Sequence, residues 1–509
     1  MSRKLRDVLL IILYGLIGVS FNIVLLNICI RKYIFVNMIA RIIITLIICV
    51  GMYLLLGKIN DFLNRHYVKI LIVFLSVMLV AQIVFGYFLE IVPNWDFMYV
   101  FNGAIKWAET GSFADYNRYY YMYPNNIGPM MFYMVFFKLV KLVGITNYQM
   151  VATIINAVLN VGMMLVVFLI CKKLWSVKSG IFSLFIFMIN LPSYFGAAVF
   201  YTDVLTMIFP VLFFYLYLRL KEAKTNKSKL ILMVLMGLVL FLGMKLKFTV
   251  IIVAIAIFVD MVLNGMFKKL IAMGVTVGII YLVGALIFSS VIYPSHLDKS
   301  IAEEKNFPAL HWIVMSMKGD GGFDQNDENF TNSFDTPEHR DEALRIRLRN
   351  RIEVLGVSGF RELMITKSVK CFGDGTYELN AFFSHGMKRN TFLNDYIVGD
   401  GKYYKDYEQF CSGIFLAFIL LMVVGNFISV YEIISRTYSV CDKFVPYLAV
   451  FGLLLFLLMW ETSPRYITNY IPMIYICAVA AMSKVDDILA ARGLDVDKAG
   501  KKDKSVMVE

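Results

Sequence analysis

The sequence has 509 residues, of which 59% are hydrophobic and 17% are charged, with 42 phenylalanines and 30 tyrosines. Soluble domains of this length carry more charge and less apolar surface, so the composition excludes a soluble enzyme and predicts an integral membrane protein. The formal net charge of +12 would suit a nucleic-acid partner. We expect no nucleic acid, because the basic residues gather in short segments between apolar runs, as in cytoplasmic loops. These segments are 2–6, 219–229, 268–269 and 498–504.

Apolar runs of about 17 to 24 residues recur along the chain, and each is long enough to cross the bilayer as a helix. The sequence therefore predicts an all-α polytopic bundle of about twelve transmembrane helices. The first three are expected at 8–30, 39–57 and 70–89. The others are expected at 148–171, 180–200, 203–219, 230–244, 248–264, 270–293, 412–434, 445–460 and 466–483.

The charge pattern predicts a multi-pass protein of the cell membrane with both termini in the cytoplasm. Lys58, Arg65 and Lys69 separate the second and third runs, which places residues 90–147 outside. Residues 128–144 are also apolar, but they are short and contain two lysines. We interpret them as a juxtamembrane or re-entrant helix, and whether they span the membrane stays open.

Four regions follow from this topology. Residues 1–293 form an N-terminal transmembrane module that contains the first outer loop, 90–147. Residues 294–410 form an extracytoplasmic subdomain, in which a helix is expected over 337–354. Residues 411–483 form the C-terminal transmembrane helices, and 484–509 form a charged cytoplasmic tail.

Three acidic residues, Asp96, Asp203 and Glu461, each follow an apolar run and reach the outer side under this one topology. Ionisable residues in such positions are costly and mark functional sites. Two alternatives stay open: Asp203 would also suit the N-cap of the helix that follows it, and Glu461 would suit an ion pair with Arg465.

Three basic residues, Lys245, Lys247 and Arg465, are expected at the same level. Cations there can anchor helices by reaching toward the headgroups. They can also bind a phosphate, because Arg offers a two-pronged donor and Lys a point charge. A carboxylate that takes a proton and cations that hold a phosphate leaving group are what sugar transfer from a lipid phosphate requires.

Taken together, several short motifs occur in an order that resembles the GT-C superfamily of membrane glycosyltransferases. The resemblance is to family 39, the protein mannosyltransferase and aminoarabinose transferase group, in its Gram-positive form. The motifs are Trp95-Asp96-Phe97, Tyr123-Pro124-Asn125-Asn126-Ile127-Gly128, Tyr201-Thr202-Asp203, Lys247-Phe248-Thr249, His311-Trp312 and Pro464-Arg465-Tyr466. This chain departs from the family in having a single Asp, and no Asp-Glu pair, in its first loop.

The resemblance implies a polyprenyl-phosphate-linked sugar donor and transfer at the outer face to an envelope glycan, such as teichoic acid or another polysaccharide. It implies Asp96 as the catalytic base, Asp203 as a second acidic site residue, and Lys247 and Arg465 as ligands of the donor phosphate. The position of Lys245 beside Lys247 makes it a further candidate for binding that phosphate. Residues expected to line the substrate are Trp95, Tyr123, Asn125, Asn126, Tyr201, His311, Trp312 and Glu461. His311 would equally suit a packed position within the subdomain.

No metal ligand set is evident in the sequence, because only five histidines occur and none are paired at ligand spacing. Asp320, Asp324, Asp327 and Glu328 lack the spacing of a calcium loop, and we expect them to be solvated. No cofactor is established, and a requirement for a divalent cation stays open.

Two rival functions stay open as well. A polysaccharide polymerase or ligase would share a large outer loop and would use glycans linked to a lipid diphosphate. A secondary transporter would share the many helices, but it would place polar residues and broken helices near the middle of the bilayer.

Overall fold

The computed structural model describes residues 2–435 and 443–491. Within these ranges the chain is helical throughout; it contains no β-strand, and its one isolated bridge joins Ile91 and Met387. The predicted all-α class is therefore confirmed. The helix α23 (Ile471–Ala491) continues past the expected start of the tail, and the rest of that tail, from 492, lies outside the described residues.

Every predicted transmembrane run falls on a helix or a broken helix. These elements are α1 (Arg3–Arg31), α2 (Phe35–Lys58), α3 (Asn60–Leu89), α7 (Tyr148–Leu174), α8 (Val177–Ile189) with α9 (Pro192–Phe195), α10 (Thr202–Leu205) with α11 (Ile208–Glu222), α12 (Asn226–Leu246), α13 (Ile251–Leu263), α14 (Phe267–Ile292), α21 (Tyr404–Ile434), α22 (Phe444–Met459) and α23.

Among the described residues, nine helices are long and apolar enough to cross a membrane. A tenth crossing would use α8 and the segment from Pro192 to Ala198, which bend by 79° at Pro192. A proline favours this bend because it lacks the amide hydrogen that would continue the helix. The prediction of twelve crossings also needs the shorter helices α13 and α22, and it stays a prediction.

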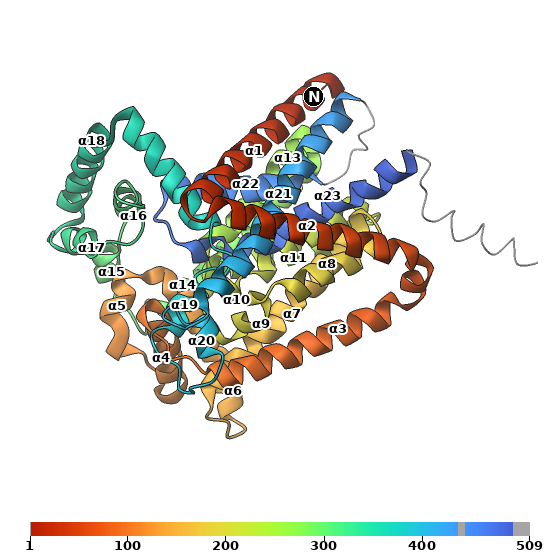
Figure 1. Ribbon diagram of the computed structural model, residues 1–509. Coiled ribbons are helices and arrows are strands. Elements are labelled where there is room, and N and C mark those ends of the chain that lie inside the picture. The colour runs from red at the N-terminus through yellow and green to blue at the C-terminus, as the bar shows by residue number, and fades with distance from the viewer. Residues whose placement is uncertain (1, 436–442, 492–509) are drawn as a thin grey trace, which may run out of the picture.

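The remaining helices gather at one end of the bundle, which we call the loop face (Figure 1). Residues 90–147 contribute α4 (Trp95–Thr110), α5 (Asn117–Met122) and α6 (Ile127–Lys141). The large insertion contributes α15 (Lys299–Lys305), α16 (Ala309–Met315), α17 (Gln325–Asn332), α18 (Pro337–Phe372), α19 (Leu379–Phe383) and α20 (Asn394–Ile397). The amide of Phe307 donates to Met122 O at 3.2 Å, and the amide of Val92 to Gly386 O at 2.9 Å. The two segments therefore form one surface.

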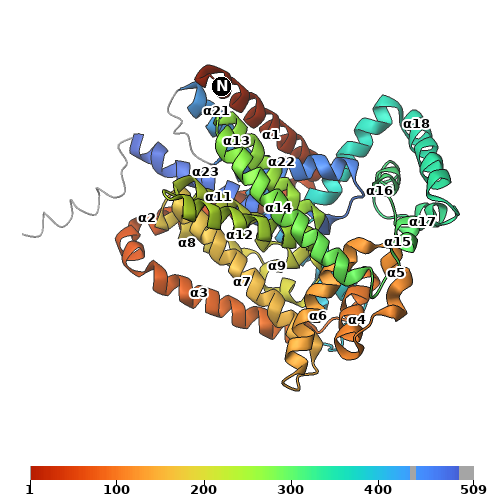
Figure 2. The ribbon, with the colours of Figure 1, turned by 180° about the vertical axis from the view of Figure 1, so that it is seen from behind.

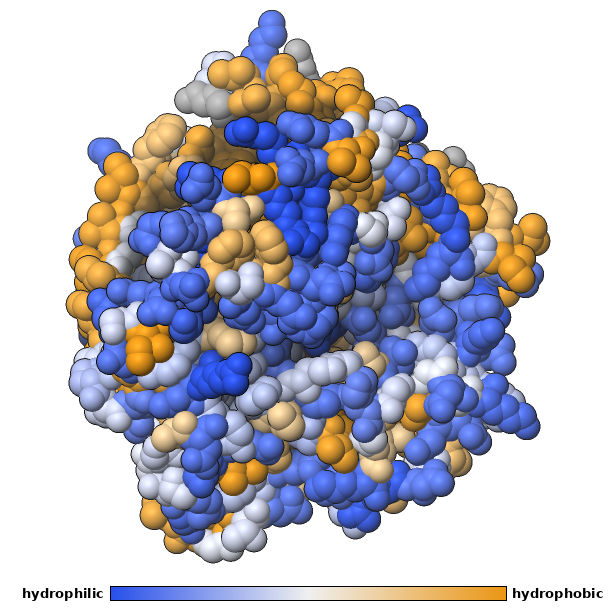
Figure 3. Space-filling model, turned by 90° about the vertical axis from the view of Figure 1, so that its left-hand side faces the viewer, coloured by the Kyte–Doolittle hydropathy of each residue, from blue (hydrophilic) through white to orange (hydrophobic). Residues whose placement is uncertain are grey.

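Hydrophilic residues cover most of the loop face, and apolar residues gather around its margin (Figure 3). The helix α6 belongs to this face: its apolar side, including Tyr133 and Phe137, is buried, and α4 is its main neighbour. Leu142 and Val143, just after the helix, are exposed. The helix has only 15 residues, which fits the juxtamembrane interpretation.

The helix expected at 337–354 is present but continues to Phe372 as α18. Its axis breaks at Gly356, where φ is 54° and ψ is −171°. Only glycine adopts this conformation without strain, so the sequence signal for the break is a single glycine.

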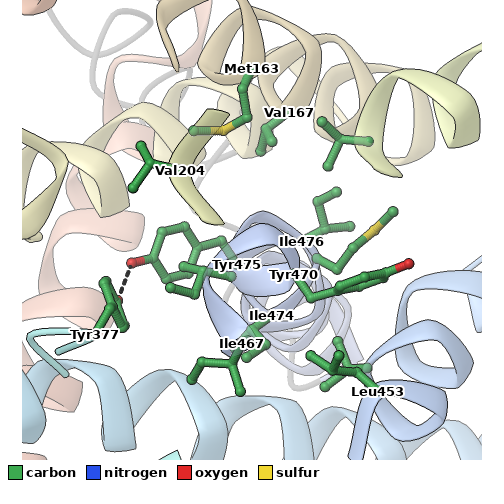
Figure 4. Close-up of a cluster of buried hydrophobic side chains, with 14 of the residues drawn as sticks. Met163, Val167, Val204, Tyr377, Leu453, Ile467, Tyr470, Ile474, Tyr475 and Ile476 are labelled. Atoms are coloured by element: carbon green, nitrogen blue, oxygen red, sulfur yellow. Dashed lines mark hydrogen bonds between the residues drawn. The ribbon is translucent and has the colours of Figure 1, made fainter. Parts of the chain in front are cut away.

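The helix α23 forms the centre of the bundle (Figure 4). Tyr475 and Ile476 of α23 lie among Met163 and Val167 of α7, and the hydroxyl groups of Tyr475 and Tyr377 lie 3.0 Å apart. In contrast, α14 lies along the outside of the bundle (Figure 2), and little of it is buried.

The basic segments at the starts of α1 and α12 lie at the end of the bundle opposite the loop face. Arg31, at the end of α1, forms an ion pair with Glu362 of α18, so the basic start of α1 lies at the far end. Lys247, just after α12, pairs with Asp203, and the 21 residues of α12 place its basic start about 30 Å away.

Candidate functional site

Three residues far apart in the sequence form an ionic cluster on the loop side of the bundle. Asp203 lies in the first turn of α10 and is 3% exposed at its side chain. Lys247 follows the last residue of α12 in an extended conformation, and its ammonium group forms an ion pair with the Asp203 carboxylate. Arg465 Nε lies 3.9 Å from Asp203 Oδ2. The structure therefore brings together one predicted acid and two predicted phosphate ligands.

This cluster excludes both alternative roles of the acids. The N-cap of α10 is Tyr201 and no side chain caps the helix, so Asp203 is an ion-pair partner and not a cap. Arg465 pairs with Asp203, whereas Glu461 accepts a hydrogen bond from Tyr466 at 2.8 Å. Glu461 and Arg465 form no ion pair among the described residues, although the guanidinium lies close enough to lower the pKa of Glu461.

The two cations are half-buried, and Arg465 is not fully satisfied. Burial lowers the pKa of Lys247, and the Asp203 carboxylate opposes that effect. The Arg465 guanidinium lies over three rings, with its carbon 5.9 Å from Tyr201, 5.6 Å from Phe382 and 5.4 Å from Tyr466. Its Nε is buried and has no hydrogen-bond partner among the described residues. The cluster can therefore accept a further anion, and a phosphate oxygen suits a guanidinium donor.

The catalytic candidate Asp96 lies in the first turn of α4 and is half-buried. Tyr119 donates a hydrogen bond to Asp96 Oδ1 at 2.6 Å, and Asn126 Nδ2 donates to the Tyr119 hydroxyl at 2.6 Å. The Tyr201 hydroxyl donates to Asn126 Oδ1 at 3.3 Å. A continuous set of hydrogen bonds therefore links the Asp96 carboxylate to Tyr201.

Tyr201 lies between the Asp96 network and the ionic cluster. Burial raises the pKa of Tyr201, the Asp96 and Asp203 carboxylates raise it further, and Arg465 lowers it. The Asp96 network and the ionic cluster are therefore both close enough to change the pKa of the Tyr201 hydroxyl. The residues expected from the first loop, the second outer turn and the last outer turn form one site.

Backbone strain marks the start of α4. Trp95 has φ of 45°, which is rare for a bulky residue, and it directly precedes Asp96. Trp95 is 48% exposed, and its ring lies 4.1 Å from the ring of His385. Strained residues persist where their surroundings hold them, and such positions cluster at functional sites.

Glu461 and the aromatic residues form the insertion side of the site. Burial raises the pKa of Glu461, hydrogen bonding from Tyr466 and the nearby Arg465 guanidinium lower it, and the Asp96 carboxylate raises it. The ring of Tyr123 lies 6.3 Å from that of Trp312, and Trp312 lies 6.3 Å from Trp460. Tyr123 and Trp312 are half-buried at this edge, as their predicted lining role requires.

Three predicted residues are not brought into the site. His311 is buried inside the insertion with Nδ1 2.7 Å from Thr331 Oγ1, and burial lowers its pKa to about 4. His311 is therefore packed within the insertion, which was the alternative to its predicted lining role. The Lys245 ammonium lies 4.4 Å above the ring of Phe288 of α14, away from Asp203. Asn125 is exposed in the short turn before α6.

No group of three or more His, Cys, Asp or Glu side chains that could hold a metal occurs in the described ranges. Of the four acidic residues expected to be solvated, Asp320 is exposed and Asp324 and Glu328 are half-buried, and only Asp327 has a different role. Asp327 is buried and accepts salt bridges from Arg347 at 2.8 Å, Arg351 at 2.6 Å and Lys318 at 3.3 Å. It stabilises the packing of α17 against α18.

Sequence reasoning did not single out Phe382 and Glu378, and it placed Tyr119 only in an aromatic cluster that suits sugar stacking or the membrane interface; all three contact predicted site residues. Tyr119 belongs to an aromatic run in the first loop, which is its only local signal. Glu378 follows an Asp-Gly turn, and its carboxylate accepts a hydrogen bond from Ser463, two residues before Arg465. Such contacts depend on tertiary structure, so the sequence alone gives no spacing rule for them.

A family model described as conserved hypothetical integral membrane protein matches residues 3–485 of the chain. No curated protein matches the sequence.

Proposed function

The chain belongs to the conserved hypothetical integral membrane protein family, and we propose that it is a GT-C-type glycosyltransferase. It moves a sugar from a polyprenyl phosphate to an envelope glycan at the outer face of the cell membrane. The observation that supports this proposal best is the convergence of Asp96, Asp203, Lys247 and Arg465 from four separate segments of the chain.

The cationic half suits the donor phosphate. Lys247 and Arg465 are held by Asp203, which keeps them in place when no anion is bound. A bound donor phosphate would accept a hydrogen bond from Arg465 Nε. As the bond to the sugar breaks, negative charge grows on this phosphate, and its attraction to Lys247 and Arg465 grows with it. Stabilising charge that grows in the transition state is the largest single contribution in many enzymes.

Asp96 suits the role of general base. Among the described residues its side chain has one hydrogen-bond partner, Tyr119, at Oδ1. The remaining oxygen can accept the proton of an acceptor hydroxyl. The acceptor oxygen then bonds to the anomeric carbon while the bond from that carbon to the phosphate oxygen breaks. The proton stays on Asp96, the polyprenyl phosphate leaves with the electron pair, and the anomeric configuration inverts.

The charge distribution supports an outward loop face. The basic segments at the starts of α1 and α12 lie at the opposite end of the bundle, where the positive-inside tendency places the cytoplasm. The chain would then have both termini inside, and the site would face the outer leaflet.

The test is transfer by the purified protein in liposomes that contain a polyprenyl-phosphate sugar. We expect Asp96→Asn to lower the turnover rate by at least about 100-fold, the usual contribution of a general base, while polyprenyl phosphate still binds. Asp115→Asn is the control, because Asp115 lies in the same loop but only pairs with the exposed Lys106. Substantial turnover by Asp96→Asn would remove Asp96 from the mechanism.

The donor separates the rival functions. Transfer of one sugar from a monophosphate supports the proposal. Consumption of a long glycan on a lipid diphosphate would favour a polymerase or ligase, and solute uptake without transfer would favour a transporter.

A further inference from the structure

A tight turn at the end of α18, residues 374–378, lies against the last loop-face turn of the chain. Asp374 Oδ1 accepts hydrogen bonds from the amide of Thr376 at 2.9 Å and from its hydroxyl at 2.7 Å. Asp374 Oδ2 accepts from the amide of Glu378 at 3.0 Å. The amide of Gly375 donates to Ser412 Oγ at 3.0 Å. The turn is therefore fixed both internally and to α21.

This turn contains two strained residues in succession. Tyr377 has φ of 58° and Glu378 has φ of 56°. Together with Trp95 they are the only residues other than glycine with φ above 40° in the part of the chain that the structure describes. Trp95 precedes Asp96 and Glu378 contacts the segment of Arg465, so two of the three border the candidate site. Glycine would occupy these positions without strain, so the side chains carry a role that the backbone conformation alone does not explain.

The side chain of Glu378 contacts the segment that carries Arg465. Its Oε2 accepts a hydrogen bond from the hydroxyl of Ser463 and lies 3.4 Å from the amide nitrogen of Arg465. The helix α19 starts directly after Glu378 and places the ring of Phe382 5.6 Å from the guanidinium carbon. One short segment of the insertion thus holds both the backbone and the side chain of Arg465.

We propose that Glu378 is a positioning residue that fixes Arg465 for the donor phosphate. This inference rests on the proposed function. The carboxylate does not touch the reacting atoms; it holds the turn before Arg465, so that the guanidinium keeps its place above Tyr201 and beside Asp203. A glycine would adopt the backbone conformation of residue 378 without strain. The strained glutamate is retained because its carboxylate is needed to contact Ser463 and the amide of Arg465.

The test compares thermal stability with lipid binding. Glu378→Gly removes the carboxylate and relieves the strain, and Glu378→Gln keeps an oxygen that can accept the same bonds. We expect Glu378→Gly to melt at or above the wild-type temperature, but to bind polyprenyl phosphate about tenfold more weakly. In the transfer assay the KM for the donor should rise more than kcat falls. Glu378→Gln should lie between the two, and the exposed helix residue Glu353→Ala should match the wild type.

Two outcomes would overturn the inference. In the first, Glu378→Gly melts at a lower temperature while the folded fraction binds the lipid as well as the wild type; the residue is then only structural. In the second, the wild-type protein binds no polyprenyl phosphate, which overturns the proposed function too. A wild type that binds the lipid but transfers no sugar overturns the enzyme proposal alone, and the binding comparison still decides the role of Glu378.

Discussion

Lys245 and Lys247 are two residues apart, yet their ammonium groups lie in different surroundings. Lys245 belongs to the last turn of α12 and faces the rings of α14. Lys247 is the first extended residue after the helix, with φ of −158° and ψ of 118°, and this change of direction brings it to Asp203. In the sequence both lysines are close to the same turn. Their contacts differ because α12 ends between them, at Leu246, and the sequence does not fix that end.

This difference predicts opposite results for two matched variants. Lys247→Met leaves the buried Asp203 with only the distant Arg465, which should cost about 3–5 kcal/mol of folding stability and abolish measurable polyprenyl phosphate binding. Lys245→Met should change stability and binding little. Thermal unfolding and a lipid-binding assay measure both effects.

If Lys247→Met fails to fold, a double variant can still test the role of Lys247 in lipid binding. Lys247→Met combined with Asp203→Asn removes the unpaired carboxylate but also the partner of Arg465, so we expect stability to recover in part while binding does not. Equal loss of lipid binding in Lys245→Met would contradict the assignment.

Gly128 explains how α6 is placed against the site. A Cβ atom at this position would lie 1.9 Å from the carbonyl oxygen of Lys245. The start of α6 therefore packs directly on the backbone at the end of α12, next to Lys247. The Tyr123 to Gly128 motif combines a hydrogen-bonding residue, Asn126, with a glycine required for close packing.

We expect Gly128→Ala to lower the free energy of unfolding by about 1–3 kcal/mol, because the new methyl group meets backbone that cannot move away easily. It should also weaken transfer, since the end of α12 carries Lys247. Gly278→Ala of α14 is the control, because a methyl group there would meet nothing within 4 Å and alanine favours a helix. If the two variants were equally stable, the close packing of α6 on α12 would be ruled out.

Hydropathy was sufficient to predict the long apolar helices, because each of them corresponds to one continuous run of apolar residues in the sequence. The break in α8 and α9 and the continuation of α18 past Gly356 were not predicted. Both depend on one proline or one glycine inside a longer helix, and such residues are also common in unbroken turns. The helix α18 also lacks a clear apolar stripe, so its second half gave no periodic signal.

At the scale of the whole molecule, a topology derived from charge predicted that the acidic and basic residues share one end. The structure brings Asp96, Asp203, Lys247, Arg465 and Glu461 into one region, as that topology requires. The individual partners could not be predicted, because they depend on the rotation of each helix about its axis. His311 shows the same limit: its sequence neighbour Trp312 borders the site, whereas the histidine faces inward.

The orientation of the whole bundle gives a further prediction. A reporter that is active only outside the cytoplasm should be active when inserted beside the exposed Asp400 of the loop face. It should be inactive at the N-terminus and beside the exposed Thr225, at the far end of α12. Activity at both Asp400 and Thr225 would contradict this arrangement of the bundle, and the reverse pattern would place the site in the cytoplasm.

The peripheral helix α14 touches mainly α12 and leaves most of its circumference to acyl chains. Because little of α14 is buried, single side chains on its outward side contribute little to the packing of the bundle. A fluorophore or spin label on that outward side therefore offers a way to watch the protein at work without altering the machinery that it reports on.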